Sequence, residues 1–499
     1  MFGHCKLKDL TKQQLLSNRS LGKYFKMQKS SIEYGELIAR RTFSMNDQLR
    51  FASFSADSNP IHIDSVSARR SMIGKCIVHG IHGLMYALEL LKKHSDVKVR
   101  SFEANFLKPI PLDTLIGLFW NAKKNILLIA NENIVFSSIS IEIDEIIQKD
   151  NLLDLETGNP LSSPRNLTLK QCQEFDEQKL IYRGDIIAGQ NLFPYFFECY
   201  GESIAAELAT TSEIVGMEIP GLHSLFLNIK GVFHKKKMDP SYKLLNCSRF
   251  GVMQLLMIGH YLKCEIEAFY SRNSADALKM QQVAKSTQSN EFSKVNALII
   301  GGSRGLGELT AKIISCGGGT STITYSSGSI DAKGVQEEII EWGGFCDIAQ
   351  LNIEDNFRIP NQEYNQIYYF PTPKIIVEDP SNLEDNLLER YKLYYVDGFC
   401  NLLKIVSGKN SKASIFYPST TFAKNPPKGF LTYAKTKLMG ESLCREFVEK
   451  EGMRIFYSRL PRLPTDQTLG LVPEKFEDPL KVMHPIISRM QELYNQEMI

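Results

Sequence analysis

Apolar positions along residues 38–147 follow first a helical and then a strand-like spacing. Residues 45–54 carry apolar side chains at helical intervals, and Ser44 before them is a residue type that caps helix N-termini. A second helix, apolar on most faces, is expected to begin near Gly80. Strand-like runs follow at residues 97–107, 114–120, 126–131 and 134–143. This order predicts a buried helix wrapped by a curled antiparallel sheet.

Residues 186–270 repeat this order more faintly. Residues 218–226 can be laid over residues 77–85 at a constant offset of 141, which puts Gly221 on Gly80. One local match can arise by chance. The agreement in the order of elements nevertheless favours an internal duplication.

A polar linker precedes a change of pattern. Residues 273–293 are rich in serine, asparagine and glutamine and contain one short helical stretch. Val295–Ile300 is then a short apolar run that ends in a glycine-rich turn, as a buried parallel strand does. The expected segments are an N-terminal extension (1–37), a first domain (38–150), a second domain (151–272), the linker (273–293), an α/β domain (294–470) and a C-terminal tail with an amphipathic helix (471–499).

Composition narrows the class of protein. A chain of 499 residues is too long for one core, and its net charge of +2 provides no basic field for a nucleic acid. The ten cysteines are scattered without a C-x-x-C pair, which is typical of reduced thiols rather than of disulfides or a zinc site. We find neither a secretory signal nor eighteen consecutive apolar residues. We therefore expect a soluble cytoplasmic protein with no membrane or nucleic-acid partner.

Two short motifs in the first domain form an acid/base set. Asp57 and His62 lie in the sequence Asp-Ser-Asn-Pro-Ile-His, and residues 77–83 read Ile-Val-His-Gly-Ile-His-Gly. This pattern resembles the catalytic segment of MaoC-like (R)-specific enoyl hydratases, a hotdog-fold family that acts on acyl thioesters. The resemblance implies that Asp57 and His62 grip one water as acid and base, against the alternative of a structural His62. It also implies that the backbone N–H at Gly80 binds the thioester oxygen, assisted by the helix dipole.

The same resemblance and the residue spacing also suggest roles for the remaining histidines and for the second domain. We expect His79 to pack beside the thioester mouth and His82 to be a hydrogen-bonded core residue. A metal site is not expected, because no cysteine and no pair of histidines four residues apart completes one. The offset of 141 places Glu198 and Ser203 opposite the dyad, so the second half lacks it. The resemblance to double-hotdog hydratases then implies that this half houses the acyl chain.

A second signature lies in the α/β domain. Gly301-Gly302-Ser303-Arg304-Gly305-Leu306-Gly307 follows the predicted strand and opens a helix, so its backbone N–H groups can approach a pyrophosphate. Tyr433 and Lys437 are four residues apart and share one helix face, and Ser419 follows the strand-like residues 413–417. Together these motifs resemble the short-chain dehydrogenase/reductase family over residues 294–470.

This resemblance implies specific roles. Tyr433 would be the general acid, Lys437 would lower its pKa and bind ribose, and Ser419 would orient the substrate carbonyl. Arg304 is similar to the residue that meets the 2′-phosphate in NADP-preferring members, and residues 322–327 contain no acid for a free ribose hydroxyl. We therefore expect NADP(H), bound by Gly301, Ser303, Arg304, Gly305, Leu306, Gly307, Tyr433 and Lys437.

Two of the departures of the α/β domain from that family lie where cofactor and proton relay are expected. Residues 368–373 replace the usual Asn-Asn-Ala-Gly, and Tyr395 stands where an asparagine of the proton relay is expected. A reductase domain that only binds its cofactor, or serves as a scaffold, is therefore kept as an alternative. The expected fold is an α+β hotdog, taken as a double hotdog, followed by an α/β Rossmann-type doubly wound parallel sheet.

These features lead to one principal hypothesis and two rivals. The principal hypothesis is a bifunctional enzyme that reduces 3-oxoacyl thioesters with NADPH and interconverts 3-hydroxyacyl and 2-enoyl thioesters. Its partner would be an acyl-CoA or an acyl-carrier-protein thioester, and self-association of the chain is left open. The rivals are a hydratase with a degenerate reductase domain and a non-catalytic module that binds acyl-CoA or NADP.

Overall fold

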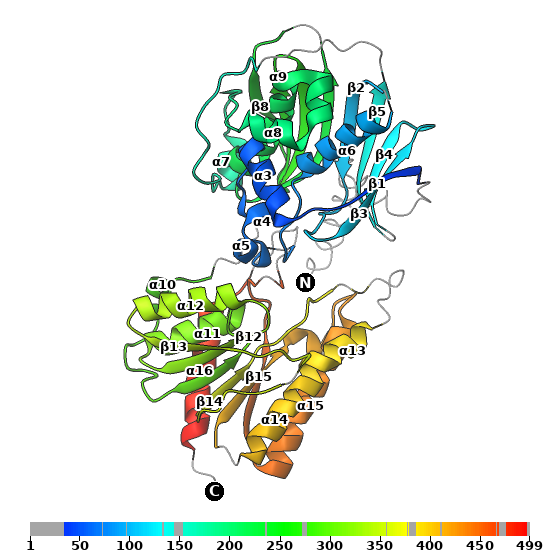
Figure 1. The fold of residues 1–499 in the computed structure, drawn as a ribbon. Coiled ribbons are helices and arrows are strands. Elements are labelled where there is room, and N and C mark those ends of the chain that lie inside the picture. The colour runs from blue at the N-terminus through cyan, green and yellow to red at the C-terminus, as the bar shows by residue number, and fades with distance from the viewer. Residues whose placement is uncertain are drawn as a thin grey trace, which may run out of the picture. The chain divides into compact units, whose positions relative to one another are not determined.

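The computed structural model describes residues 34–496, apart from residues 72, 96, 132–133, 144–152, 235–236, 272–276, 356, 377, 379–385, 410–411, 466 and 469–475. The chain divides into two compact units (Figure 1). The first unit comprises the chain up to residue 68 together with residues 75–272, and the second comprises residues 69–74 and the chain from residue 273. Residues 1–33 of the predicted extension, and residues 471–475 and 497–499 of the predicted tail, lie outside the described residues.

The first half of the first unit follows the predicted order of elements. Its elements are β1 (Glu36–Thr42), α3 (Met45–Ser55), α4 (Pro60–Ile63), α5 (Ser65–Arg69), α6 (Gly80–His94), β2 (Val99–Phe106), β3 (Leu115–Asn121), β4 (Ile126–Ala130) and β5 (Val135–Ile143). Ser44 caps α3 as expected, because its hydroxyl accepts from the Asp47 N–H while the Asp47 carboxylate accepts from the Ser44 N–H. The four predicted strands are confirmed, and β1 is an additional one.

Helix α6 forms the centre of this half. Ten of its fifteen residues are buried, which is why the sequence is apolar on most of its faces. The strands lie in the order β1-β3-β4-β5-β2 and pair antiparallel. The glycine turn before α6 therefore lies at the start of a buried helix, where its N–H groups meet the interior of the unit.

The second half repeats the order of elements. It contains α7 (Leu169–Gln173), β6 (Gln178–Lys179), α8 (Ile186–Leu192), α9 (Pro194–Glu213), the π-helix η2 (Ile214–Glu218), β7 (Ser224–Phe233), β8 (Ser241–Cys247), β9 (Val252–Ile258) and β10 (Leu262–Tyr270). Its strands continue the sheet in the order β7-β10-β9-β8-β6, the mirror image of the first half. Antiparallel pairing of β2 with β7 joins the halves into one ten-stranded sheet.

The predicted offset of 141 between the halves is wrong, although the repeat itself is present. Gly80 begins α6, whereas Gly221 lies between η2 and strand β7. The counterpart of α6 is α9, so Glu198 and Ser203, which both lie in α9, are not counterparts of the dyad. A nine-residue match of small and apolar residues could not distinguish a turn that opens a helix from a turn that opens a strand.

The second unit is a parallel α/β sheet. Its elements are α10 (Met280–Ala284), β11 (Asn296–Ile300), α11 (Gly305–Cys316), β12 (Thr320–Tyr325), α12 (Ser329–Glu341), β13 (Phe345–Gln350), β14 (Gln366–Tyr369), α13 (Leu387–Lys392), η3 (Leu393–Asp397), α14 (Gly398–Gly408), β15 (Ser414–Thr420), η4 (Thr421–Ala423), α15 (Leu431–Glu451), β16 (Arg454–Leu460) and α16 (Pro479–Asn495). The strand order β13-β12-β11-β14-β15-β16, with every pair parallel, is the order of a doubly wound dinucleotide-binding sheet.

Helix α16 belongs to this sheet rather than to a separate tail. Leu480, Met483, Ile487 and Met490 on one of its faces are buried in the same apolar cluster as α11 and β11. The predicted domain boundary at residue 470 therefore excludes a helix that completes one face of the sheet. Among the described residues, no helix is long and apolar enough to cross a membrane.

Candidate active sites

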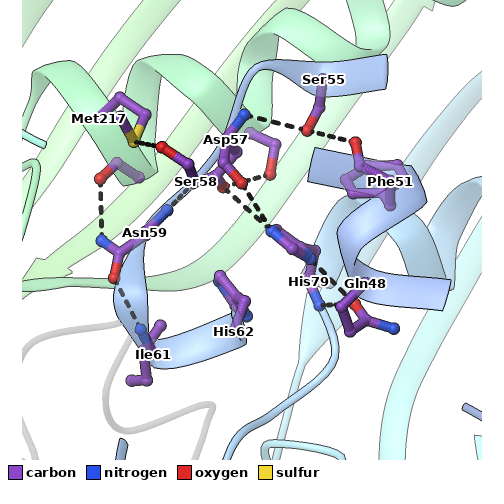
Figure 2. A network of polar contacts seen from close by, with 12 residues as sticks. Gln48, Phe51, Ser55, Asp57, Ser58, Asn59, Ile61, His62, His79 and Met217 are labelled. Carbon is purple, nitrogen blue, oxygen red and sulfur yellow. Dashed lines mark hydrogen bonds and ion pairs between the residues drawn. The ribbon is translucent and has the colours of Figure 1, made fainter. Parts of the chain in front are cut away.

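The loop that carries Asp57 is held by both halves of the first unit. Helix α3 ends at Ala56, whose φ of 58° turns the chain sharply, and α4 begins after Asn59. The Asn59 side chain caps α4 by accepting from the Ile61 N–H at 3.1 Å. Its Nδ2 donates to the carbonyl of Gly216 in the second half at 2.8 Å (Figure 2). Asn59 therefore fixes the loop locally and across the repeat.

Asp57 is buried and accepts two hydrogen bonds. The Ser212 hydroxyl, from α9, donates to Oδ2 at 2.7 Å, and the Asn59 N–H donates to Oδ1 at 3.1 Å. Burial raises the pKa of this carboxyl above its ordinary value, while His62 and the two donors act to lower it. The second half thus supplies a donor that favours the ionised form of Asp57.

The contact of His62 with the backbone fixes its tautomer. Nδ1 lies 2.8 Å from the carbonyl oxygen of Ile77, which can only accept, so Nδ1 carries the proton. Nε2 then keeps a lone pair that can accept a proton. Burial lowers the pKa of His62 below its ordinary value, which keeps the ring neutral near pH 7.

His79 ties the start of α6 to the Asp57 loop. Its Nε2 lies 3.0 Å from the Asp57 carbonyl, its Nδ1 lies 2.9 Å from Oε1 of Gln48, and its ring stacks on His62 at 3.8 Å between centroids. Burial holds its pKa well below the ordinary value. His79 lines the cavity described below, beside Gly80, and contacts the Asp57 loop from the start of α6.

His82 is a core residue, but the expectation that it is hydrogen-bonded is wrong. Its ring stacks on Phe51 at 4.7 Å between centroids and packs edge-on against Phe43. Among the described residues, neither ring nitrogen has a hydrogen-bond partner. Burial lowers its pKa to about 3, so the ring is neutral and packs as an aromatic group.

Three potential metal ligands do meet in this site. One ligand atom each of Asp57, His62 and His79 lies within 4.8 Å of the other two, a proximity that the sequence spacing did not indicate. Nδ1 of His79 already contacts Gln48, and its Nε2 contacts the Asp57 carbonyl. The Asp57 carboxylate already accepts two hydrogen bonds. A metal ion would have to break these contacts, so the arrangement fits acid/base chemistry better than ligation.

A cavity of about 100 Å³ brings the predicted hydratase residues together. Asp57, His62 and Gly80 all line it. Helix α6 begins at Gly80 without a side-chain cap, so the N–H groups of its first turn remain available to a ligand oxygen. A Cβ atom on Gly80 would come within 3.1 Å of the Phe106 ring, and one on Gly216 would overlap the Asp57 carboxylate. Gly216 therefore requires glycine, and the Phe106 ring would have to shift slightly to admit a side chain at position 80.

Sequence reasoning missed three residues of this site. Ser212, Gly216 and Gln48 contact the site from 155, 157 and 31 positions away along the chain, which only the fold reveals. No local motif marks Ser212 or Gly216. For Gln48 the available signal was a polar residue at a buried position of an amphipathic helix, where a partner is required.

The glycine-rich turn of the second unit has the geometry of a phosphate cradle. Gly301 has a φ of 78°, and the Gly302 N–H donates to the Thr324 carbonyl at 2.9 Å. A Cβ atom on Gly307 would overlap the Gly301 carbonyl, so α11 can approach β11 only with glycine at this position. Helix α11 begins at Gly305, next to Leu306, and has no side-chain cap. Its free first-turn N–H groups suit a pyrophosphate.

Charged side chains lie near Ser303 and Arg304 of this turn. Arg304 donates to the carbonyl of Arg69 at 3.1 Å, within the second unit. Asp331, in the first turn of α12, is buried and pairs with Arg69 at 2.9 Å. A Cβ atom on Gly328 would touch both Asp331 and, at 3.6 Å, Ser303. An acid therefore does lie near Ser303, although residues 322–327 contain none.

The structure brings Thr420, rather than the predicted Ser419, to Tyr433. Burial raises the pKa of Tyr433, and the Thr420 hydroxyl lies near enough to the phenol to act against that rise. The Ser419 hydroxyl instead donates to the Glu441 carboxylate at 2.5 Å, and Arg459 holds that carboxylate through two bonds of 2.8 Å. The reason is strand alternation, because neighbouring residues of β15 point to opposite faces. A one-residue error in spacing thus changes the side chain that meets the phenol.

Lys437 is buried, and its amine lies beside the Tyr395 ring. Its Nζ donates to the Pro418 carbonyl at 2.7 Å and lies 4.1 Å from the centre of the Tyr395 ring. Burial lowers the pKa of Lys437 to about 7 and raises the pKa of Tyr433 to about 12. The hydroxyl of Tyr395 is 2.6 Å from that of Thr372, so the two departures found in the sequence contact each other.

Comparison with known families gives a match in the segment that carries the first of these sites. Residues 33–127 match the MaoC like domain family. The MaoC-like segment thus contains α3, the Asp57 loop, α6 and strands β1 to β3, and with them Asp57, His62 and Gly80. A search of curated proteins gives no match for the chain.

Solved structures that are similar to this chain align with about two fifths of it. An oxidoreductase, yciK, from E. coli is 13% identical over 42% of this chain and 95% of its own, with a TM-score of 0.38. A short chain dehydrogenase from Burkholderia cenocepacia, in complex with NADP, is 16% identical over 40% of this chain and 92% of its own, with a TM-score of 0.35. At these values the likeness carries no functional argument, and the fold of the second unit rests on its own strand order.

Proposed function

We propose that this chain is a bifunctional acyl-thioester enzyme whose first unit, a double hotdog, adds water to 2-enoyl thioesters and removes it from 3-hydroxyacyl thioesters. The observation that carries this proposal is the meeting of Asp57, the free Nε2 of His62 and the uncapped start of α6 at Gly80 around one cavity. Their chemistry matches the two needs of the reaction, a polarised thioester carbonyl and an activated water.

The acid/base pair would hold one water between two acceptors. An ionised Asp57 and a neutral His62 both accept hydrogen bonds, so the water donates both of its protons and keeps a lone pair for C3 of the substrate. In hydration the oxygen adds to C3, one proton passes through the pair to C2, and the C2–C3 double bond becomes single. Dehydration is the reverse, and no other reactant is required.

The start of α6 would stabilise the charge that develops on the thioester oxygen. As C2 becomes nucleophilic, electron density moves onto that oxygen, and the Gly80 N–H with the positive end of the helix dipole lies on the cavity wall to receive it. His79 would keep this helix start and the Asp57 loop in register through its two ring contacts.

Hydration of crotonyl-CoA tests this activity directly. The proposal predicts loss of enoyl absorbance with the wild-type protein and a decrease in kcat/KM of at least about 100-fold for His62→Gln, since a general base contributes roughly 10²–10⁴-fold. The matched control is His94→Gln, at the other end of α6 and 35% exposed. Equal rates for His62→Gln and the wild type would exclude the proposed role.

The second unit supports reduction of a 3-oxoacyl thioester as the other activity. The glycine cradle fits a dinucleotide, and the pair of Thr420 and Tyr433 presents two hydroxyl groups that could hold a substrate carbonyl. Arg304 places a positive charge directly after Ser303, which favours NADP(H) over NAD(H), while Asp331 is paired with Arg69 rather than open to a ribose hydroxyl. When bound, the nicotinamide would supply hydride, while the Tyr433 hydroxyl would hold the proton that the carbonyl oxygen receives.

Reduction of acetoacetyl-CoA with NADPH tests the second activity. Nicotinamide consumption that is lost in Tyr433→Phe supports a reductase, whereas consumption that this change leaves unaltered excludes the assigned acid. A wild-type protein that binds NADPH without consuming it supports the rival in which only the first unit is active. The proposal includes CoA or a carrier protein as the carrier of the substrate, and a cytoplasmic location. It leaves self-association of the chain open.

A further inference from the structure

The cavity beside Asp57 is small. It measures about 100 Å³. An engineered protein cavity of about 150 Å³ holds one benzene molecule, with its six carbon atoms. By that scale the space beside the acid/base pair holds about four carbon atoms, and the thioester carbon is one of them.

Aromatic side chains from both halves limit this space. Phe106 ends strand β2, Phe226 lies on β7, and their rings pack edge to face at 5.3 Å between centroids. The Phe106 ring also packs against the helix start, because a Cβ atom on Gly80 would come within 3.1 Å of it. Phe106 therefore cannot move toward α6 to admit a longer ligand.

Residues of the second half line the cavity beside the pair, and the helix behind them is buried. Val215 of η2 is one of the lining residues. Residues 203–213 of helix α9 are all buried. Phe193, which precedes this helix, and Phe197 within it pack against Phe54 of α3 at about 6 Å between centroids. A long acyl chain that reached past the cavity would have to displace these side chains, which a close-packed core resists.

We infer that the first unit is specific for short acyl thioesters of about four carbon atoms, and that Phe106 is the residue that sets this limit. The inference rests on the proposed hydratase activity, because the cavity is assigned to the acyl group by its contact with Asp57 and His62. In the expectation drawn from the sequence the second half houses the acyl chain, and its Val215 and Phe226 are indeed among the residues that line this small cavity.

A panel of 2-enoyl-CoA substrates with four, six, eight and twelve carbon atoms tests this limit. We expect kcat/KM to be highest for four carbons and to fall by about tenfold or more once added methylenes no longer fit. Phe106→Ala should move the optimum to six or eight carbons. Phe102→Ala is the matched control, since Phe102 lies on the same strand and packs against Phe233 instead.

Binding of saturated thioesters separates this inference from the proposed activity. Butyryl-CoA and dodecanoyl-CoA cannot be hydrated, so calorimetry with them reports the cavity alone. Tighter binding of butyryl-CoA, together with hydration of crotonyl-CoA, supports both proposals. Activity that is equal or higher at twelve carbons overturns the length limit and leaves the hydratase intact. Butyryl-CoA binding without any hydration overturns the proposed activity, whereas no binding of either thioester overturns the inference.

Discussion

Replacing Ser212 by alanine removes the hydrogen bond by which the second half of the first unit acts on Asp57. The Ser212 hydroxyl donates to a buried carboxylate at 2.7 Å, and such a bond to a charged group is worth about 1.5–3 kcal/mol. One pKa unit corresponds to about 1.4 kcal/mol, so its loss should raise the pKa of Asp57 by roughly one to two units. The sign is upward because the lost donor stabilised only the ionised form.

The pH dependence of hydration measures this shift. Because the proposed mechanism needs an ionised Asp57, kcat/KM should fall on the acid side as this carboxyl is protonated, and Ser212→Ala should move that fall to higher pH by about one to two units. At a pH well above the fall, the rates of the variant and the wild type should converge.

Ser203→Ala is the matched control for this experiment. Ser203 is buried in the same helix, but its hydroxyl accepts from the Asp154 N–H and does not meet Asp57. An acid limb that stays in place in Ser212→Ala would refute the reasoning. A shift of equal size in Ser203→Ala would refute it too, because the effect would then be a general change in α9.

Three further predictions concern stability and the second unit. Burial raises the pKa of Glu207 to about 8, so its contribution to folding should be fully present below about pH 4.5 and lost as the pH rises through about 8. Chemical denaturation should show that Glu207→Gln loses this pH dependence, whose full size in the free energy of unfolding is at most about 5 kcal/mol. Thr420→Val should lower the kcat of acetoacetyl-CoA reduction by about 10²-fold, whereas Ser419→Ala should mainly lower the melting temperature; the reverse pattern would contradict the placement of Thr420 at Tyr433. Gly307→Val should abolish NADPH binding measured by fluorescence while leaving crotonyl-CoA hydration unchanged, and retained binding would argue against the cradle.

Local sequence patterns predicted the elements well, because each depends on a few neighbouring residues. Ser44 marked the start of α3, and the alternation of apolar residues marked strands β2 to β5, with end errors of one or two residues. The proximity of Asp57 and His62 was also predictable, since a short turn capped by Asn59 joins Asp57 to the helix that carries His62.

Long-range contacts could not be predicted in the same way. The donor Ser212 reaches Asp57 only because the second repeat folds against the first, and no spacing along the chain encodes that contact. The choice of Thr420 over Ser419 depends on which face of β15 meets α15, and two adjacent hydroxyl residues leave that undecided in the sequence. The contacts of Lys437 depend on the fold as well, because its amine lies against the Tyr395 ring. Burial in that position lowers the pKa of Lys437.

The central claim is that two sites in one chain act on a shared 3-hydroxyacyl thioester. Its most direct test is mass spectrometry of the products formed from acetoacetyl-CoA and NADPH by the wild type, Asp57→Asn and Tyr433→Phe. We predict 3-hydroxybutyryl-CoA with crotonyl-CoA from the wild type, 3-hydroxybutyryl-CoA alone from Asp57→Asn, and unreacted substrate from Tyr433→Phe. Formation of crotonyl-CoA by Asp57→Asn at the wild-type level, or an unreacted substrate with the wild type, would contradict the claim.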